Sequence, residues 1–222
     1  MPSLTGAAGL LLLVGWSLVS SPVEAAKTAI PKSSFNSQKD FDAVWAYNYP
    51  WGTDHNGSAR MNKSQVGLSN GTMTITAKRV SGQKAARHGG KDIAIRYLSG
   101  AISAKEHFTV ARGGGLDFVA ELKATVGRGT WPAFWLTAVD GWPPEVDMAE
   151  WKGSGKVSFN TFNTSSQVTA RDVAYPSPGA FHKFRCELKD GNGKDVEVKF
   201  FMDEKLVTTQ VGKGFTGKAL YL

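Results

Sequence analysis

The sequence predicts an all-β fold, a sandwich of two antiparallel sheets. Short runs of alternating apolar and polar residues follow one another from Phe41 onward. Gly, Asn, Asp and Pro separate these runs, and after the first 25 residues no long stretch has the 3.6-residue period of a helix. Many short strands between turn residues are typical of β-sandwiches. The length of 222 residues favours a single domain.

The clearest strand signals have a period of two. Leu, Phe and Ala occupy alternate positions in Leu116–Val126, with acidic residues and a lysine pointing the other way. Val196–Met202 alternates in the same manner, and Asp203-Glu204 predicts a hairpin turn into Leu206–Gln210. Further strands are expected over Thr72–Val80, Ile93–Ser99, Ala133–Thr137, Val157–Phe162 and His182–Leu188.

The N-terminus has the pattern of an export signal. Residues 6–19 are almost wholly apolar, and small residues around Ala25 fit the site that signal peptidase reads. The run is shorter than the roughly 20 residues of a membrane span. We therefore expect a signal peptide over 1–25 and a secreted protein without membrane attachment; an N-terminal anchor or a buried helix is the alternative. Residues 26–38 are polar and are expected to form a short irregular arm.

Composition argues for a globular protein with a basic surface. The net charge is +7, but no Lys/Arg-rich block or aromatic–basic motif indicates nucleic-acid binding. We interpret the charge as a solvated surface, with attraction to an acidic wall or acidic glycan as the alternative. The only cysteine, Cys186, excludes an internal disulfide and is predicted to be a buried apolar side chain. Seven tryptophans favour a surface on which rings stack on sugars.

Four Asn-x-Ser/Thr sequons lie in polar, turn-like segments. In a eukaryotic secretory pathway each could carry an N-linked glycan. The expected glycosylation sites are Asn56, Asn62, Asn70 and Asn163.

Three acidic residues within six positions are the strongest functional signal. In Glu145-Val146-Asp147-Met148-Ala149-Glu150, the first two acids share one face of a strand. Glu150 would point to the other face unless a β-bulge at Met148-Ala149 returned it to the first. All three acids would then project into one cleft. A solvated acidic strand is the alternative, but apolar residues between the acids and tryptophans around them argue against it.

The spacing of these acids is compatible with glycoside hydrolysis. Two glutamates leaning toward each other across Asp147 could approach the roughly 5–5.5 Å separation of a retaining glycosidase. Because neighbouring carboxylates repel one another, at least one carboxyl pKa is expected to rise. That carboxyl would keep a proton available for a leaving group.

The segment Glu145–Glu150 resembles the E-x-D-x-x-E signature of glycoside hydrolase family 16, in its laminarinase- and lichenase-like form. Trp131–Trp135, W-P-A-F-W, is similar to the strand that precedes the signature, and Ser99–Ser103 resembles the family's S-G-x-I-S strand. The resemblance covers Phe41 to the C-terminus. It implies a concanavalin A-like β-jelly roll, with the catalytic domain over 39–222. Members usually continue with a further strand, so a C-terminal truncation is expected.

The resemblance also implies roles for individual residues. Glu145 corresponds to the nucleophile, Glu150 to the general acid/base and Asp147 to an assisting acid. The positions that fall where the family lines its sugar subsites are Trp131, Trp135, Trp142, Asn160 and Phe162. Gly113-Gly114-Gly115 stands where many members have a cleft arginine, and a histidine common on the strand after the signature is absent. The choice of glycan is therefore open.

We expect a monomeric, retaining endo-β-glycanase that hydrolyses β-1,3- or mixed β-1,3/1,4-glucan, with a polysaccharide as its partner and no cofactor. A cell-wall transglycosylase, a non-catalytic glucan-binding or lectin-like protein, and an inactive truncated product are the alternatives. The four histidines lack metal-ligand spacing, and no oxygen-rich loop indicates a structural Ca²⁺. Gly212–Gly217 fits G-x-G-x-x-G, but no βαβ pattern surrounds it, which argues against dinucleotide binding.

Overall fold

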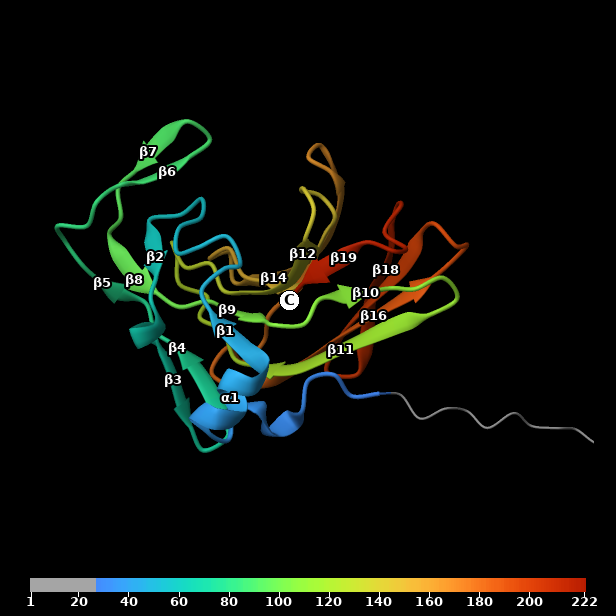
Figure 1. The fold of residues 1–222 in the computed structure, drawn as a ribbon, viewed down its shortest axis with the longest axis horizontal. Helices are drawn as coiled ribbons and strands as arrows, with labels where there is room; N and C mark the ends of the chain where they lie inside the picture. The colour runs from blue at the N-terminus through green and yellow to red at the C-terminus, as the bar shows by residue number, and fades with distance from the viewer. Residues whose placement is uncertain (1–26) are drawn as a thin grey trace, which may run out of the picture. The chain divides into compact units, whose positions relative to one another are not determined.

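The computed structural model describes residues 27–222, so the expected signal peptide over 1–25 lies outside the described residues. The chain divides between Pro31 and Lys32. The unit from Lys32 to Leu222 contains the helices and strands, and Figure 1 shows them as an all-β arrangement with short helices near its start. The predicted β-sandwich is confirmed.

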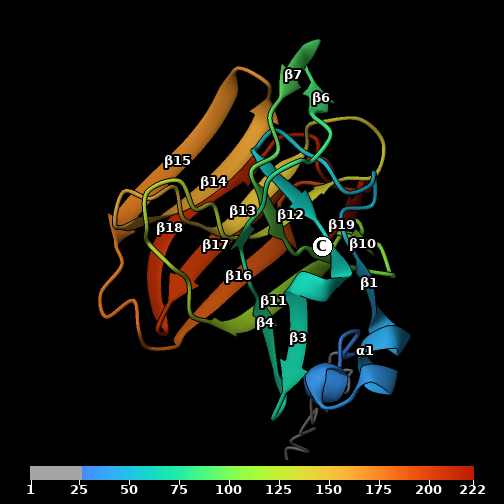
Figure 2. The ribbon, with the colours of Figure 1, turned by 90° about the vertical axis from the view of Figure 1, so that its left-hand side faces the viewer.

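Two large antiparallel sheets form the body of this unit, and Figure 2 shows them as two layers. The first has six strands, in the order β10 (Phe108–Thr109), β19 (Ala219–Tyr221), β12 (Ala133–Ala138), β13 (Glu145–Glu150), β14 (Lys156–Thr164) and β15 (Gln167–Ala174). The second has four strands, in the order β11 (Gly115–Leu122), β16 (His182–Asp190), β17 (Val196–Met202) and β18 (Lys205–Gly212).

Smaller elements occupy the part of the unit that precedes β10. The helical ones are η1 (Lys32–Phe35), α1 (Gln38–Val44) and η2 (Lys63–Gln65). The strands form four small groups: β1 (Trp45–Tyr47) with β9 (Ile102–Ala104); β2 (Ala59–Met61), β8 (Tyr97–Ser99) and β5 (Lys78–Arg79); β3 (Val66–Ser69) with β4 (Thr72–Ile75); and β6 (Ala86–His88) with β7 (Lys91–Ile93).

The core lies between the two large sheets. On β14, alternate residues point toward the four-stranded sheet, where Phe159 contacts Phe184 and Phe200 at ring-centroid distances of 6.3 and 5.6 Å. All three side chains are fully buried. Cys186 is also buried in this layer, as predicted, and its burial raises the pKa of the thiol. The other face of β14 is therefore free to carry the functional side chains of the six-stranded sheet.

Replacing Phe159 with Ala is expected to lower the free energy of unfolding by about 3–5 kcal/mol, because the change removes a fully buried ring and leaves a cavity between the sheets. The control is Phe181→Ala, since Phe181 is exposed. Urea denaturation of both variants measures the difference. Equal, small losses in the two variants would show that Phe159 does not anchor the core.

Several strand predictions are confirmed, one of them with its boundaries. Val196–Met202 is strand β17 as predicted, and the turn at Asp203-Glu204 leads into β18, with both residues at positive φ. In β11 the predicted alternation holds, because Leu116 and Phe118 are more buried than their neighbours. The expected Thr72–Val80 strand is instead broken into β4 and β5.

The N-terminal arm, expected to be irregular, contains a short helix in part of its length. Within 26–38, Lys32–Phe35 form the 3-10 helix η1. Phe35 stacks on Trp45 at 5.6 Å, and the Trp45 indole donates to the Ser34 hydroxyl. Helix α1 follows because Ser37 caps it, accepting a hydrogen bond from the Asp40 backbone N–H. Apolar anchoring therefore orders a segment whose composition is mainly polar.

Candidate active site

A β-bulge in β13 brings the three acids to one face, as predicted. Asp147 pairs with Trp135 of β12, but Ala149 pairs with the adjacent Phe134, which leaves Met148 as an extra residue. On the other side, the pairing with β14 also shifts between Asp147 and Glu150. The extra residue restores Glu150 to the face of Glu145 and Asp147. We call this side of the six-stranded sheet, which faces away from the core, the carboxylate face.

Glu145 is held by aromatic residues. The Trp142 indole N–H donates to its Oε2 at 2.8 Å, and the Trp142 ring contacts Phe162 at 5.7 Å. Burial raises the pKa of Glu145 to about 6; the Trp142 hydrogen bond opposes the rise, and the charge of Glu150 adds to it. Trp142 is half exposed. It can therefore both orient the carboxyl and present its ring to a ligand.

Asp147 lies deepest, with 4% of its surface exposed. Its pKa is raised to about 8, first by burial and then by the charges of Glu145 and Glu150. A hydrogen bond from Asn160 and the charge of Lys152 act in the opposite direction. The expected rise in a carboxyl pKa is therefore found at Glu145 and, more strongly, at Asp147. At neutral pH Asp147 is protonated and adds no negative charge between the two glutamates.

Glu150 has three donors around its carboxylate. The Trp131 indole N–H donates to Oε1, while the Asn160 amide and the Lys152 ammonium approach Oε2 at 2.9 and 2.8 Å. The carboxylate is 7% exposed, so these contacts fix its orientation within the face. The sequence did not single out Lys152, which was one of many scattered basic residues. Its signal is its position two residues after Glu150.

Asn160 connects two of the acids. Its Nδ2 donates to Asp147 Oδ2 at 2.8 Å as well as to Glu150, and its side chain is 2% exposed. The resemblance places Asn160 in a sugar subsite. In the structure Asn160 links these two carboxyls and is buried, and its place in a sugar subsite stays a prediction.

The Asp147→Asn variant is expected to lose much of the pH dependence of stability between pH 5 and 8. With its raised pKa, native Asp147 keeps a proton that the unfolded chain releases above about pH 4, so the free energy of unfolding falls as pH rises toward 8. Asn cannot ionise and removes this contribution. Urea midpoints at pH 5 and pH 8 measure it, with exposed Asp140→Asn as the control. A decline in Asp147→Asn equal to the wild-type decline would contradict the assignment.

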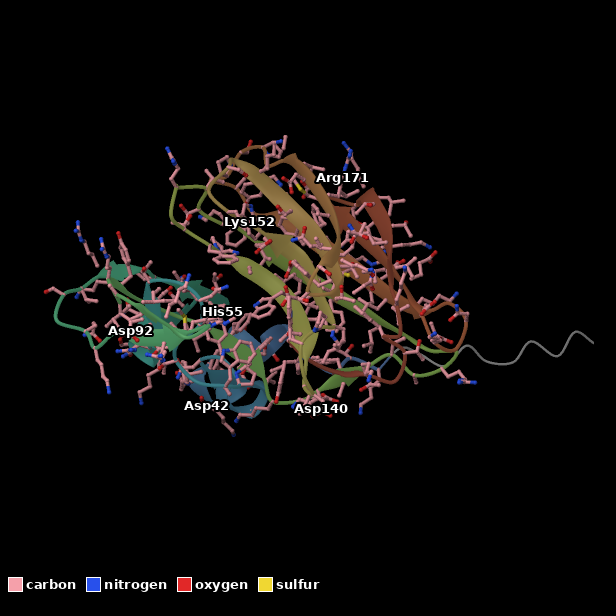
Figure 3. The ribbon with its side chains drawn as sticks, turned by 90° about the horizontal axis from the view of Figure 1, so that it is seen from above. Asp42, His55, Asp92, Asp140, Lys152 and Arg171 are labelled. Atoms are coloured by element: carbon pink, nitrogen blue, oxygen red, sulfur yellow. The ribbon has the colours of Figure 1, made fainter. Side chains whose placement is uncertain are left out.

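The other predicted aromatic residues lie at different depths. Trp131 is 54% exposed beside Glu150, whereas Trp135 is half-buried and contacts Trp51 at 6.0 Å and His55 at 6.2 Å. Trp51 in turn stacks on Tyr49, with the rings 2° from parallel. Sequence reasoning missed this cluster of Trp51, His55 and Tyr49, because some 80 residues separate it from Trp135. Figure 3 places His55 between the region of Asp92 and the strands of the six-stranded sheet.

The acids do not line the shallow cavity between β15 and β18. This cavity, about 520 Å³, is lined by residues of β15, β18 and the neighbouring turns, including Gln167 and Val211. Asn163 lies there, and its amide donates to the Val211 carbonyl while its oxygen accepts from the Lys213 N–H.

Among residues 27–222, no group of three or more His, Cys, Asp or Glu side chains is arranged to hold a metal ion. In the same part of the chain, no helix is long and apolar enough to cross a membrane.

A β-sandwich that carries two glutamates and an aspartate on one sheet, with tryptophans beside them, defines a class of carbohydrate-cleaving enzyme. The family model for glycosyl hydrolases family 16 matches residues 53–213. The chain belongs to this family. It is an endo-β-glycanase.

The chain is similar to a galactan endo-β-1,3-galactanase from Flammulina velutipes, with 46% identity over 203 residues that cover 90% of this chain and 80% of the relative. Among solved structures it resembles the κ-carrageenase from Pseudoalteromonas carrageenovora, with a TM-score of 0.59 and 17% identity over 91% of this chain and 83% of that one. It also resembles a β-1,3-1,4-glucanase (lichenase) from a mouse hindgut metagenome, with a TM-score of 0.59 and 14% identity over 81% and 78% of the two chains. The two structural likenesses show the fold.

Proposed function

We propose that this endo-β-glycanase cleaves β-1,3-linked galactan, internally and with retention of the anomeric configuration. The observation that carries the substrate is the 46% identity, over most of both chains, to the Flammulina galactanase. The expected glucan substrate is the competing proposal. It rests on the resemblance of the Glu145–Glu150 segment to the laminarinase- and lichenase-like form of the signature.

In the proposed mechanism, Glu145 attacks the anomeric carbon and forms a covalent bond to the sugar. Glu150 gives its proton to the departing glycosidic oxygen as the bond between carbon and oxygen breaks. A water molecule then attacks the same carbon, Glu150 takes its proton, and Glu145 is released. Two displacements at one carbon retain its configuration.

The remaining residues prepare the two glutamates for these roles. A protonated Asp147 separates the two glutamates without adding a negative charge between them. The Trp142 indole orients Glu145, and Asn160 ties Glu150 to Asp147. Preorganised groups of this kind lower the barrier because they do not reorganise during the reaction.

The test compares product release from unbranched β-1,3-galactan, laminarin and lichenan, with Glu145→Gln as the inactive control. Galactan cut to a ladder of oligosaccharides, with glucans untouched, supports the proposal. Cleavage of laminarin or lichenan but not galactan would overturn the substrate in favour of glucan. Proton NMR of the first products reports the anomer, and an inverted anomer would overturn the mechanism. Products longer than an added oligosaccharide would identify a transglycosylase.

We also propose that the enzyme acts outside the cell, because residues 1–25 have the pattern of a signal peptide and its substrate is a polysaccharide. N-terminal sequencing of secreted protein, with Ala26 or a neighbouring residue first, tests this. Of the four sequons, Asn163 has its amide engaged with Val211 and is the one we propose to remain unmodified. Glycopeptide mapping decides this, and a glycan on Asn163 would contradict it.

A further inference from the structure

A basic segment of the chain reaches the carboxylate face. Residues 76–99 carry six Lys or Arg side chains and one acidic side chain, a net charge of +5 within 24 residues. All seven of these side chains are exposed: Lys78, Arg79, Lys84, Arg87, Lys91, Asp92 and Arg96. The hairpin of β6 and β7 lies in the middle of this segment (Figure 1).

Two contacts attach the hairpin to the loop that contains Trp51. Arg60 donates to both oxygens of Asp54, at 2.7 and 2.9 Å, and to the Lys84 carbonyl at 3.0 Å. The His88 ring at the hairpin tip meets His55 edge to face at 5.8 Å. The loop and the hairpin are therefore held side by side.

The same loop also contacts strand β12 next to the acids. His55 and Trp51 both contact Trp135, and Trp135 is the β12 partner of Asp147. Cross-strand partners share one face of a sheet. An unbroken series of side chains, from His88 through His55 and Trp135, thus connects the hairpin tip to the carboxylate face.

The two faces of the hairpin differ in charge pairing. Ala86, 3% exposed, and His88 lie on the face that packs against the protein, and Lys91 is the cross-strand partner of His88. Arg87 and Asp92 are partners on the other face and neutralise each other in an ion pair at 3.1 Å. Within residues 27–222, neither Lys84 nor Lys91 belongs to an ion pair. Lys91 is thus a cation without an ion-pair partner on the hairpin face that carries His88, the residue whose ring contacts His55.

We propose that these side chains bind an anionic group, a carboxylate or a sulfate, carried by the polysaccharide at one end of the carboxylate face. We call the surface the basic rim, formed by Trp51, His55, Lys84, His88 and Lys91. The ring of Trp51, 46% exposed, provides a platform for the sugar, and the ammonium groups provide charge for its anionic substituent. Burial and the neighbouring His88 lower the pKa of His55, so His55 is neutral at pH 7 and can hydrogen-bond to hydroxyls. The inference rests on the proposed function and extends its substrate to acidic, decorated galactan.

The test measures binding without turnover, in the Glu145→Gln background. The probes are a uronate-bearing β-galactan and the same polymer after its carboxyl groups are reduced to alcohols, compared by affinity electrophoresis at low ionic strength. The Lys84→Gln/Lys91→Gln pair is expected to weaken binding of the acidic polymer roughly tenfold, and that of the reduced polymer less than twofold. Raising the salt to about 0.5 M should remove the difference, since salt screens exposed charges.

The control is Lys189→Gln/Lys205→Gln, which removes the same charge from exposed positions on the four-stranded sheet. Equal losses in the two pairs, or no loss in either pair with the uronate-bearing polymer and with a sulfated galactan, would overturn the basic rim. A sulfated galactan serves as a third probe: a selective loss there, instead of with uronate, assigns the anion as sulfate. If the active enzyme cleaves no galactan while the rim variants still lose affinity, the proposed function fails and the rim stands.

Discussion

Replacing Glu145 with Gln is expected to reduce hydrolysis at least about 10⁴-fold, the largest loss among the single substitutions considered. The amide is a poor nucleophile and cannot form the covalent sugar intermediate. Because Gln keeps the size of the side chain and can still accept the Trp142 hydrogen bond through its carbonyl, the fold and the affinity for polysaccharide should be retained. Reducing-end release measures turnover, and calorimetry measures binding.

The matched control for Glu145 is Glu121→Gln, at an exposed position on β11 of the opposite sheet. It should keep wild-type turnover. The Glu145→Gly variant adds a second readout, because azide can enter the vacated space, attack the anomeric carbon of an activated glycoside and give a glycosyl azide of inverted configuration. A Glu145→Gln enzyme with more than about one tenth of wild-type activity would exclude Glu145 as the nucleophile.

Replacing Glu150 with Gln is expected to slow hydrolysis of the polysaccharide by about 10²–10⁴-fold, the usual contribution of general acid catalysis. The loss should be far smaller for the first step with a dinitrophenyl glycoside, because that leaving group departs without a proton. Stopped-flow release of dinitrophenolate against steady-state cleavage of galactan separates the two steps.

A loss of equal size on both substrates would contradict the role of Glu150 as proton donor and would indicate a structural one. A structural role for Glu150 is a real alternative, because Trp131, Lys152 and Asn160 all contact its carboxylate. Thermal melts of the variant are therefore part of the test. The exposed Glu106→Gln serves as the control for the loss of one carboxylate.

Local patterns in the sequence were sufficient for most of the sandwich. Strands such as β17 alternate strictly, because one face of each is buried against the other sheet and the other meets solvent. Strand β15 was missed, since its side chains are nearly all exposed and its sequence has no apolar face. Helix α1 was missed too, because its seven residues are too few for a 3.6-residue period to be seen.

The acidic segment determined the site more closely than a regular strand would allow. Glu145, Asp147 and Glu150 can share one face of a strand only if the strand contains one extra residue. The structure has this bulge at Met148. The requirement that all three acids point to one face could therefore be inferred from their spacing in the sequence. For the pKa values, the sequence predicted only that crowding raises the pKa of at least one carboxyl. The burial of Asp147, which only the structure shows, places the largest rise at that residue.

By itself, then, the sequence determined the sandwich, the bulged strand and the three acids, because each depends on neighbours a few positions apart. Only the tertiary structure decided that Asn160 and Lys152 hold Glu150, and that Trp51, His55 and His88 join Trp135 from segments some 40 to 90 residues earlier in the chain. Such contacts follow from how strands pair and sheets pack across long separations. The periodicity of apolar residues within a single segment therefore cannot predict these long-range contacts.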